Sequence, residues 1–132
     1  TLVTFVRQRD FPGEYDHLDA FRSRDRGATW QRLGRVAEVH NPAAAVHLGG
    51  DAIAVAYGHR TAPYGIHARV SRDGGDTWGE VVRLREDGLG EDLGYPRMGR
   101  RADGKLVTVY YYTTAERPEQ HLAATVWDPD AF

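Results

Sequence analysis

Ser23-Arg24-Asp25-Arg26-Gly27-Ala28-Thr29-Trp30 recurs later in the chain as Ser71-Arg72-Asp73-Gly74-Gly75-Asp76-Thr77-Trp78. The two octets share Ser, Arg, Asp, Gly, Thr and Trp in the same order, and they begin at positions 23 and 71. A repeat of about 40 to 50 residues between strand-like segments is typical of β-propeller blades and not of helical solenoids. The octets therefore predict a chain built of propeller blades.

Strand-like segments repeat together with the octets. Residues 2–6, 53–57 and 106–110 are short runs of β-branched and aromatic residues, and each is followed by a polar loop and a second run at 18–23, 66–71 or 122–127. No helical periodicity of useful length interrupts them. After Trp127 the third octet is reduced to Asp128-Pro129-Asp130, so a degenerate copy is expected near 127–130. We predict an all-β fold in which residues 1–132 form one partial propeller of about two and a half four-stranded antiparallel blades.

The residue types of the octet are those of a hairpin turn. Its Asp can accept hydrogen bonds from backbone N–H groups of the same turn, and its Ser and Thr hydroxyls can act in the same way. The Gly at the fifth position of the octet supplies a positive φ. The Trp at its last position is expected to bury a large apolar area. We therefore predict structural and not catalytic or calcium-binding roles for Ser23, Asp25, Gly27, Thr29, Trp30, Ser71, Asp73, Gly75, Thr77 and Trp78.

The up-and-down order of strands in a blade divides the loops between two faces. The octets share one face with the short hairpin turns at 49–51 and 102–104. The opposite face receives longer loops rich in Arg, Tyr, His and Asp, at 7–17, 59–64 and 113–121, and the inter-blade entries at 39–42 and 92–97. Such a set on a rigid β scaffold is where a binding site is expected.

Composition excludes several classes of function. The chain has 17 Lys+Arg against 19 Asp+Glu, a net charge of −2, which gives no support to nucleic-acid binding or to a polybasic membrane contact. No cysteine is present, and no apolar run approaches the roughly 18 residues that span a bilayer. The histidines form no motif with ligand spacing, so we expect neither a metal nor a cofactor. The chain begins inside a strand-like run, so we expect its true start to lie upstream.

The octets resemble the Asp-box, or bacterial neuraminidase (BNR) repeat. The order of features from 7 to 112 resembles the later blades of sialidases, which are retaining exo-α-neuraminidases built as six-bladed propellers. The resemblance implies that arginines bind the sialic acid carboxylate, that a Tyr paired with a Glu is the nucleophile, and that a separate Asp is the acid/base. Tyr95 matches the nucleophile, although a core aromatic at the start of a strand is the alternative. The implied substrate-binding residues are Arg7, with Arg9 as its rival, Arg60, Arg97, His59 and Asp92.

The chemistry of this resemblance is coherent. Guanidinium groups hold a carboxylate through two parallel hydrogen bonds, and a neutral phenol avoids the repulsion that an anionic nucleophile would meet beside that carboxylate. The chain departs from the family at Pro96, where a small polar residue is usual, and at Arg97, which adds a charge. The Glu partner and the acid/base Asp would lie upstream of Thr1.

Three functions therefore stay open. The first is part of a sialidase-like glycoside hydrolase, the second a non-catalytic carbohydrate-binding propeller, and the third a propeller enzyme acting on another acidic glycan. In each case the expected ligand is a carbohydrate, acidic in the first and third. Two and a half blades leave open sheet faces, so the further expected partner is the remaining upstream blades or a second copy of the chain.

Overall fold

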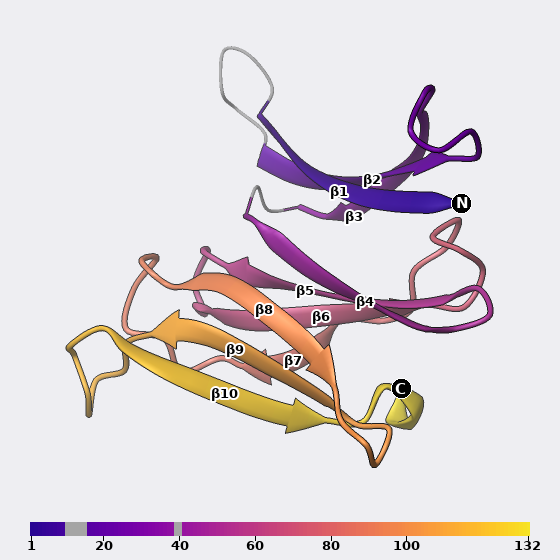
Figure 1. Cartoon of the computed structure of the whole chain (residues 1–132). Coiled ribbons are helices and arrows are strands. Elements are labelled where there is room, and N and C mark those ends of the chain that lie inside the picture. Colours follow the sequence, from indigo (N-terminus) through magenta and orange to yellow (C-terminus); the bar gives the residue numbers. More distant parts are fainter. Residues whose placement is uncertain (10–15, 39–40) are drawn as a thin grey trace.

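The computed structural model of the chain describes residues 1–9, 16–38 and 41–132 as ten strands and one short 3₁₀ helix, with no α-helix among them (Figure 1). The elements are β1 (Leu2–Arg9), β2 (Asp16–Ser23), β3 (Gln31–Ala37), β4 (Ala43–Gly49), β5 (Ala52–His59), β6 (Gly65–Ser71), β7 (Val82–Arg85), β8 (Gly94–Arg100), β9 (Leu106–Tyr112), β10 (His121–Trp127) and η1 (Pro129–Ala131). The predicted all-β class is confirmed.

The strands form three antiparallel sheets in the order of propeller blades. β4-β5-β6-β7 is one complete four-stranded blade, here called the second blade. β1-β2-β3 supplies the last three strands of the first blade, and β8-β9-β10 the first three strands of the third. The sheets stack face to face, and the inner strands β4 and β8 lie next to each other (Figure 1). The predicted partial propeller is therefore confirmed.

Strand register gives equivalent positions in the three blades. In each blade one residue near the start of the second strand pairs with the last residue of the third strand. These pairs are Leu2–Ser23, Ile53–Ser71 and Leu106–Trp127. Residues can therefore be matched between blades by counting along each strand from these pairs.

The octets form the turns between the third and fourth strands. In the second blade, Asp73 Oδ1 accepts a hydrogen bond from Thr77 N (2.9 Å), and Oδ2 accepts one from Thr77 Oγ1 (2.5 Å). Ser71 Oγ accepts one from Gly75 N (2.8 Å), where the chain takes a φ of 97°. The hydrogen bonds from Thr77 hold the pKa of Asp73 down at about 2. The first octet repeats these contacts at Ser23, Asp25, Gly27 and Thr29. After β10, Asp128 instead caps η1 by accepting a hydrogen bond from Asp130 N (2.9 Å).

The two octet tryptophans lie in different surroundings. Trp78 packs edge-on against Phe5 of the first blade, with ring centroids 5.6 Å apart. Trp30, which we expected to be buried, is 44% exposed. That expectation was wrong for this chain, because within the described residues no blade precedes the first and offers a partner like Phe5.

Removal of the Ser71 hydroxyl is expected to destabilise the second blade. Ser71 is 1% exposed, so Ser71→Ala would leave the Gly75 N–H buried without its acceptor. We expect the free energy of unfolding to fall by about 1–3 kcal/mol, measured by urea denaturation of the complete protein. Glu80→Ala, at an exposed residue just beyond the octet, is the control and should change it by less than about 0.5 kcal/mol. Equal effects of the two substitutions would contradict this role of Ser71.

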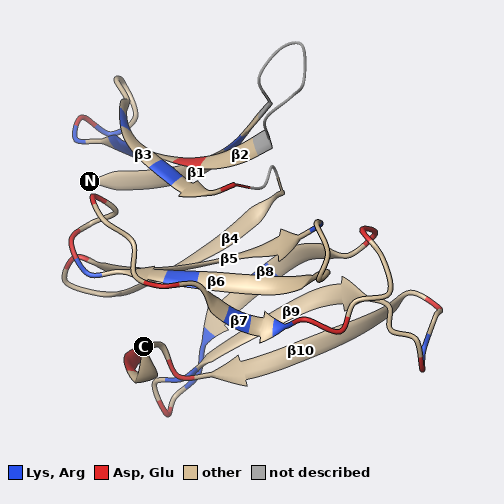
Figure 2. Ribbon diagram, turned by 180° about the vertical axis from the view of Figure 1, so that it is seen from behind, with Lys and Arg blue, Asp and Glu red and all other residues tan. Residues whose placement is uncertain are grey.

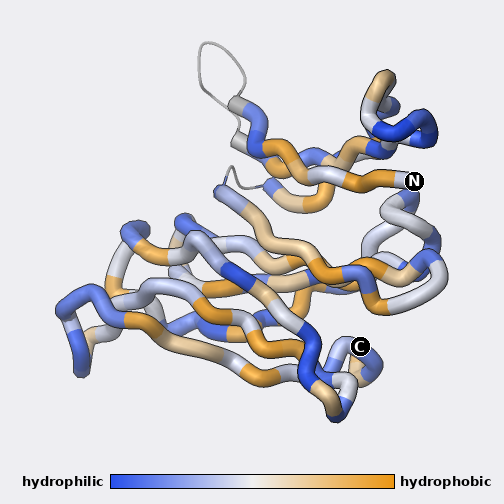
Figure 3. Tube along the Cα trace, viewed as in Figure 1, coloured by the Kyte–Doolittle hydropathy of each residue, from blue (hydrophilic) through white to orange (hydrophobic). Residues whose placement is uncertain are grey.

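The hydrophobic core lies between the blades. One buried cluster joins the first and second blades (Leu18, Ala20, Val36, Val55 and Tyr57). Two others join the second and third blades (Ala54, Ala56, Ala68, Val70, Val82, Leu106 and Trp127; Ile66, Leu93, Tyr110 and Tyr112). Hydrophobic residues accordingly follow the strands in Figure 3. The outer face of the third blade exposes Val109, Leu122 and Val126.

Arginine side chains make hydrogen bonds from blade to blade. Figure 2 shows that many charged residues lie in loops and at strand ends. Those that cross between blades include Arg22 to Asp76, Arg69 to the Val36 carbonyl, Arg72 to the Pro129 carbonyl and Arg100 to the Leu48 carbonyl. The blades are therefore held together at their margins by guanidinium groups as well as by the apolar core.

Candidate functional site

The described loops divide between two faces as the strand order predicts. The octets, the short hairpin turns and η1 lie at one end of the sheets, and the β5–β6, β7–β8 and β9–β10 loops lie at the other (Figure 1). The second group contains the Arg, Tyr and Asp residues singled out above. We call this end the mouth.

Tyr95 stands at a break in the pairing of the first strand of the third blade. Gly94 pairs with Tyr111 and Arg97 with Val109, so Tyr95 and Pro96 form an irregularity in β8. Pro96 has no N–H and leaves no unpaired donor in this break. Tyr95 adopts a φ of 45° and is 49% exposed. Among the described residues Tyr95 is therefore not part of a hydrophobic core, and a strained, exposed side chain at a bulge is characteristic of functional sites.

Arg60 follows β5 and lies over Tyr95. Its guanidinium carbon is 5.6 Å from the centre of the Tyr95 ring. Its Nε donates to the Leu93 carbonyl (3.1 Å) and its Nη2 to the Tyr111 hydroxyl (3.1 Å). Gly58 permits this arrangement, because a Cβ there would lie 3.3 Å from the Gly94 Cα. The second and third blades thus approach closely below the site.

Tyr111, Asp92 and Gln120 complete the group. The Tyr111 ring lies 5.9 Å from that of Tyr95, and its hydroxyl donates to Asp92 Oδ1 (2.8 Å). Gln120 Nε2 donates to the other Asp92 oxygen. Burial and the hydrogen bond to Asp92 raise the pKa of Tyr111 to about 12, so this phenol stays protonated at neutral pH. We call Arg60, Asp92, Tyr95, Tyr111 and Gln120 the Tyr95 cluster.

Two members of the Tyr95 cluster were not predicted from the sequence. Tyr111 belongs to the run 110–112, in which alternate side chains of a strand point to opposite faces. Tyr110 and Tyr112 are buried while Tyr111 is half-buried, so alternation alone could have separated it from its neighbours. Gln120 lies at the end of a long loop, and no local pattern marks it.

The structure places Arg97 and Arg7, two further predicted arginines, outside the Tyr95 cluster. Arg97 is exposed and donates to the Pro96 carbonyl (3.0 Å), and Arg7 is exposed on β1. Counted from the equivalent pair, Arg9 and Arg60 both stand seven residues after Leu2 and Ile53. Register therefore favours Arg9 over Arg7 as the counterpart of Arg60 in the first blade. The side chain of Arg9 lies outside the described part of the chain.

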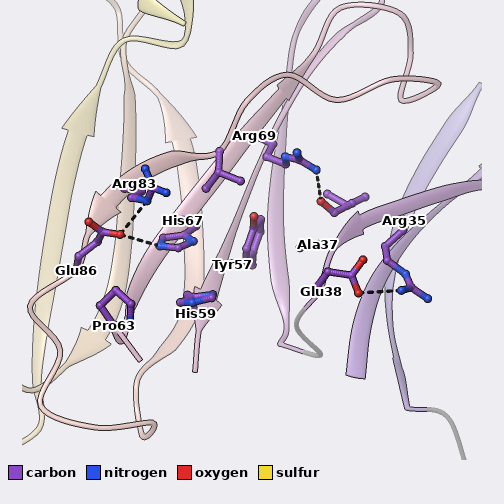
Figure 4. A pocket seen from close by; sticks show the side chains of 12 residues that line it. Arg35, Ala37, Glu38, Tyr57, His59, Pro63, His67, Arg69, Arg83 and Glu86 are labelled. Atoms are coloured by element: carbon purple, nitrogen blue, oxygen red, sulfur yellow. Dashed lines mark hydrogen bonds and ion pairs between the residues drawn. The ribbon is translucent and has the colours of Figure 1, made fainter. Parts of the chain in front are cut away.

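His59 faces a different space from Arg60. His59 is the last residue of β5, and its ring stacks on that of His67, with the ring centroids 4.3 Å apart. Both rings line a pocket between the first and second blades (Figure 4). Among the described residues there is no group of three or more His, Cys, Asp or Glu suited to a metal ion. No helix in the same residues is long and apolar enough to cross a membrane.

The buried His67 predicts a pH dependence of stability. Burial, followed by the charges of His59 and Arg83, lowers the pKa of His67 from 6.5 to about 4. The unfolded chain takes up the proton first, so stability should fall by roughly 2–3 kcal/mol as the pH drops from 6.5 to 4. The measurement is the free energy of unfolding across this range. His67→Ala copies Ala123, its equivalent in the third blade, and should flatten the slope; an unchanged slope would contradict the assignment.

Comparisons with known proteins show the propeller fold of the chain but assign it no activity. No protein-family model and no curated protein matches the chain. A protein of unknown function from Dyadobacter fermentans is 26% identical with a TM-score of 0.70, over 94% of this chain and 38% of its own. An α-L-arabinanase of Penicillium chrysogenum, solved with arabinobiose, is 18% identical with a TM-score of 0.70, over 98% and 42%. An α-L-arabinofuranosidase of Fusarium graminearum, solved with an iminosugar inhibitor, is 16% identical with a TM-score of 0.69, over 96% and 41%.

These neighbours define the architecture. The chain spans less than half the length of each of the three and has the fold of part of a glycosidase-type β-propeller. The two enzymes among them are an arabinofuranosidase and an arabinanase and are not sialidases.

Proposed function

We propose that the complete protein is a glycoside hydrolase that binds the end of a glycan at the mouth, with Tyr95 as nucleophile. The observation that carries this proposal is the exposed Tyr95 ring held at a strained bulge with the Arg60 guanidinium over it. Hydrolytic propellers among the structural neighbours support it at the level of fold.

The reaction would proceed in two displacements. Tyr95 Oη bonds to the anomeric carbon, the glycosidic bond breaks, and an acid protonates the departing oxygen. Water then attacks the same carbon and releases Tyr95. Within the described residues no carboxylate is hydrogen-bonded to Tyr95, and Asp92 is already engaged by Tyr111 and Gln120. The base that accepts the phenol proton and the acid would therefore come from other parts of the complete protein.

Arg60 favours an acidic sugar as substrate. It has no carboxylate partner among the described residues, and its two observed hydrogen bonds use Nε and Nη2. Nη1 remains for a ligand, and a guanidinium beside the reacting centre attracts a carboxylate. A sialoside or a uronide supplies such a carboxylate. In a sialoside it is attached to the anomeric carbon itself, where a neutral phenol would react without charge repulsion.

A neutral furanoside is the second candidate. It is favoured by the two arabinan-related neighbours, one of which was solved with the neutral disaccharide arabinobiose. It also agrees with Arg60 being partly occupied, because the Leu93 carbonyl and Tyr111 hydroxyl already fix its orientation.

The deciding experiment is hydrolysis of three substrates by the complete protein: a fluorogenic α-sialoside, a fluorogenic β-glucuronide and an arabino-oligosaccharide. Turnover of either acidic substrate supports the leading proposal. Turnover of the arabinoside alone replaces it with the second candidate. Binding of any of the three without turnover, by a folded protein, would make this a carbohydrate-binding propeller and overturn the catalytic assignment.

A further inference from the structure

The pocket beside His59 is a second concave site, distinct from the Tyr95 cluster. It encloses a volume of about 500 Å³ between the outer strand of the first blade and strands β5 to β7 of the second. That size lies within the range of small-molecule sites. Figure 4 shows Tyr57, His59 and His67 on one wall and the end of β3 on the other, with Arg69 reaching across to the first blade.

At the interface between the second and third blades, large side chains fill the position that corresponds to this pocket. Ala37 pairs with Leu18 and Arg85 with Ile66, at equivalent positions in the first and second blades. His59 and Tyr112 are likewise equivalent, six residues after Ile53 and Leu106. Between the second and third blades, the Arg85 guanidinium lies 4.6 Å from the centre of the buried Tyr112 ring. The pocket therefore exists because Ala37 and His59 replace this large pair, and it is not a gap that every blade interface must have.

The charges around the pocket leave one cation without an acidic partner. Arg35 pairs with Glu38 (2.8 Å) and Arg83 with Glu86 (2.9 Å), at equivalent positions of the two blades. Arg69 has no carboxylate partner among the described residues and donates only to the Val36 carbonyl (2.7 Å). Loss of hydration lowers the pKa of the buried His67 and of the partly buried His59, so both rings are uncharged at neutral pH. The pocket thus carries one unneutralised positive charge.

The pocket also contains hydrogen-bonding groups and flat ring surfaces beside the Arg69 charge. The Tyr57 hydroxyl has no hydrogen bond to any described residue, and Arg69 lies close enough to act electrostatically on its phenol. The stacked rings of His59 and His67 and the ring of Pro63 offer surfaces on which a sugar ring can pack. The rim carboxylates Glu38 and Glu86 can accept hydrogen bonds from hydroxyl groups.

We propose that this inter-blade pocket binds a monosaccharide-sized sugar acid, with its carboxylate on Arg69 and Tyr57 and its ring against His59. The site is separate from the Tyr95 cluster, and the proposal does not depend on the hydrolytic activity. A neutral sugar would leave the Arg69 charge uncompensated and should bind more weakly.

The test compares methyl β-D-glucuronide with methyl β-D-glucoside, which differ only in the carboxylate. Binding is measured by calorimetry on the complete protein carrying Arg60→Gln, so that Arg60 cannot hold the carboxylate at the mouth. We expect the glucuronide to bind at least about tenfold more tightly than the glucoside. In NMR spectra the imidazole signals of His59 and His67 should shift on adding the glucuronide.

Two further variants locate the binding. Ala37→Arg with His59→Tyr copies the filled interface and should reduce glucuronide affinity at least about tenfold, as should Arg69→Gln. Arg97→Gln, at an exposed arginine of the mouth face, is the matched control and should leave affinity unchanged. The proposal is overturned if millimolar glucuronide neither binds nor shifts the histidine signals, if both glycosides bind equally, or if the filled-pocket variant binds as the parent does.

Discussion

Gly65→Ala is expected to lower the free energy of unfolding by about 3 kcal/mol or more, which can prevent the second blade from completing its sheet. A Cβ at this position would lie 1.9 Å from the Arg85 carbonyl oxygen and 2.8 Å from the carbonyl carbon. Both atoms belong to the backbone of β7, so no side chain can turn away to make room. Relief requires β7 to separate from β6 where Ile66 pairs with Arg85.

Gly99→Ala is the control for this prediction. Gly99 also lies in a strand, and a Cβ there would meet nothing within 4 Å. Its substitution should leave the unfolding free energy within about 1 kcal/mol of the parent. The measurement is urea denaturation of the complete protein followed by tryptophan fluorescence. A Gly65→Ala protein as stable as the Gly99→Ala protein would show that β7 does not approach β6 as closely as described.

Tyr95→Phe is expected to lower kcat by about a thousandfold or more on whichever glycoside the complete protein hydrolyses. The substitution removes only the Oη that would bond to the anomeric carbon. The ring can still lie beneath Arg60 and beside Tyr111, so substrate binding should change little. The measurement is kcat and KM separately, with the affinity for a non-hydrolysed substrate analogue as a check on the site.

Tyr111→Phe provides the contrast within the same cluster. It removes the hydroxyl that links Arg60 to Asp92 but no group that would bond to the sugar in the first displacement. We expect a loss of about three- to thirtyfold, mainly in KM, because Arg60 loses part of its orientation. Equal losses in the two variants would argue that Tyr95 positions the substrate and is not the nucleophile. Full activity of the Tyr95→Phe protein would show that Tyr95 is not the nucleophile.

The fold could be predicted because its strongest signals are local. The octets contain the acceptor, hydroxyl and glycine of one turn within eight residues, and each octet forms that turn. Because consecutive strands of a blade run in opposite directions, knowing that the octet joins the third and fourth strands also tells which loops lie at the mouth. The exposure of Trp30 was not predictable in this way, because it depends on a neighbouring blade and not on the octet itself.

The site was harder to predict because its contacts join distant parts of the chain. The sequence grouped His59 with Arg60, but the His59 ring stacks on His67 whereas Arg60, just beyond the end of β5, lies over Tyr95. It chose Arg7 as the first arginine, whereas register makes Arg9 the counterpart of Arg60. Tyr111 belongs to the Tyr95 cluster because its hydroxyl is hydrogen-bonded to Arg60 and Asp92, which come from two other segments. Spacing along the chain does not reveal such contacts.

The arginines that join the blades have a consequence for alkaline conditions. Lys105 is the only lysine in the chain, and the side chains that join the blades in the described ranges through hydrogen bonds from a positive charge are guanidinium groups. Guanidinium groups keep their proton well above the pH at which lysine amines become neutral. Alkali and amine-directed reagents, which neutralise or block lysines, would therefore leave these connections intact, and an acylating label would mark one side chain, that of Lys105, at a turn remote from the mouth.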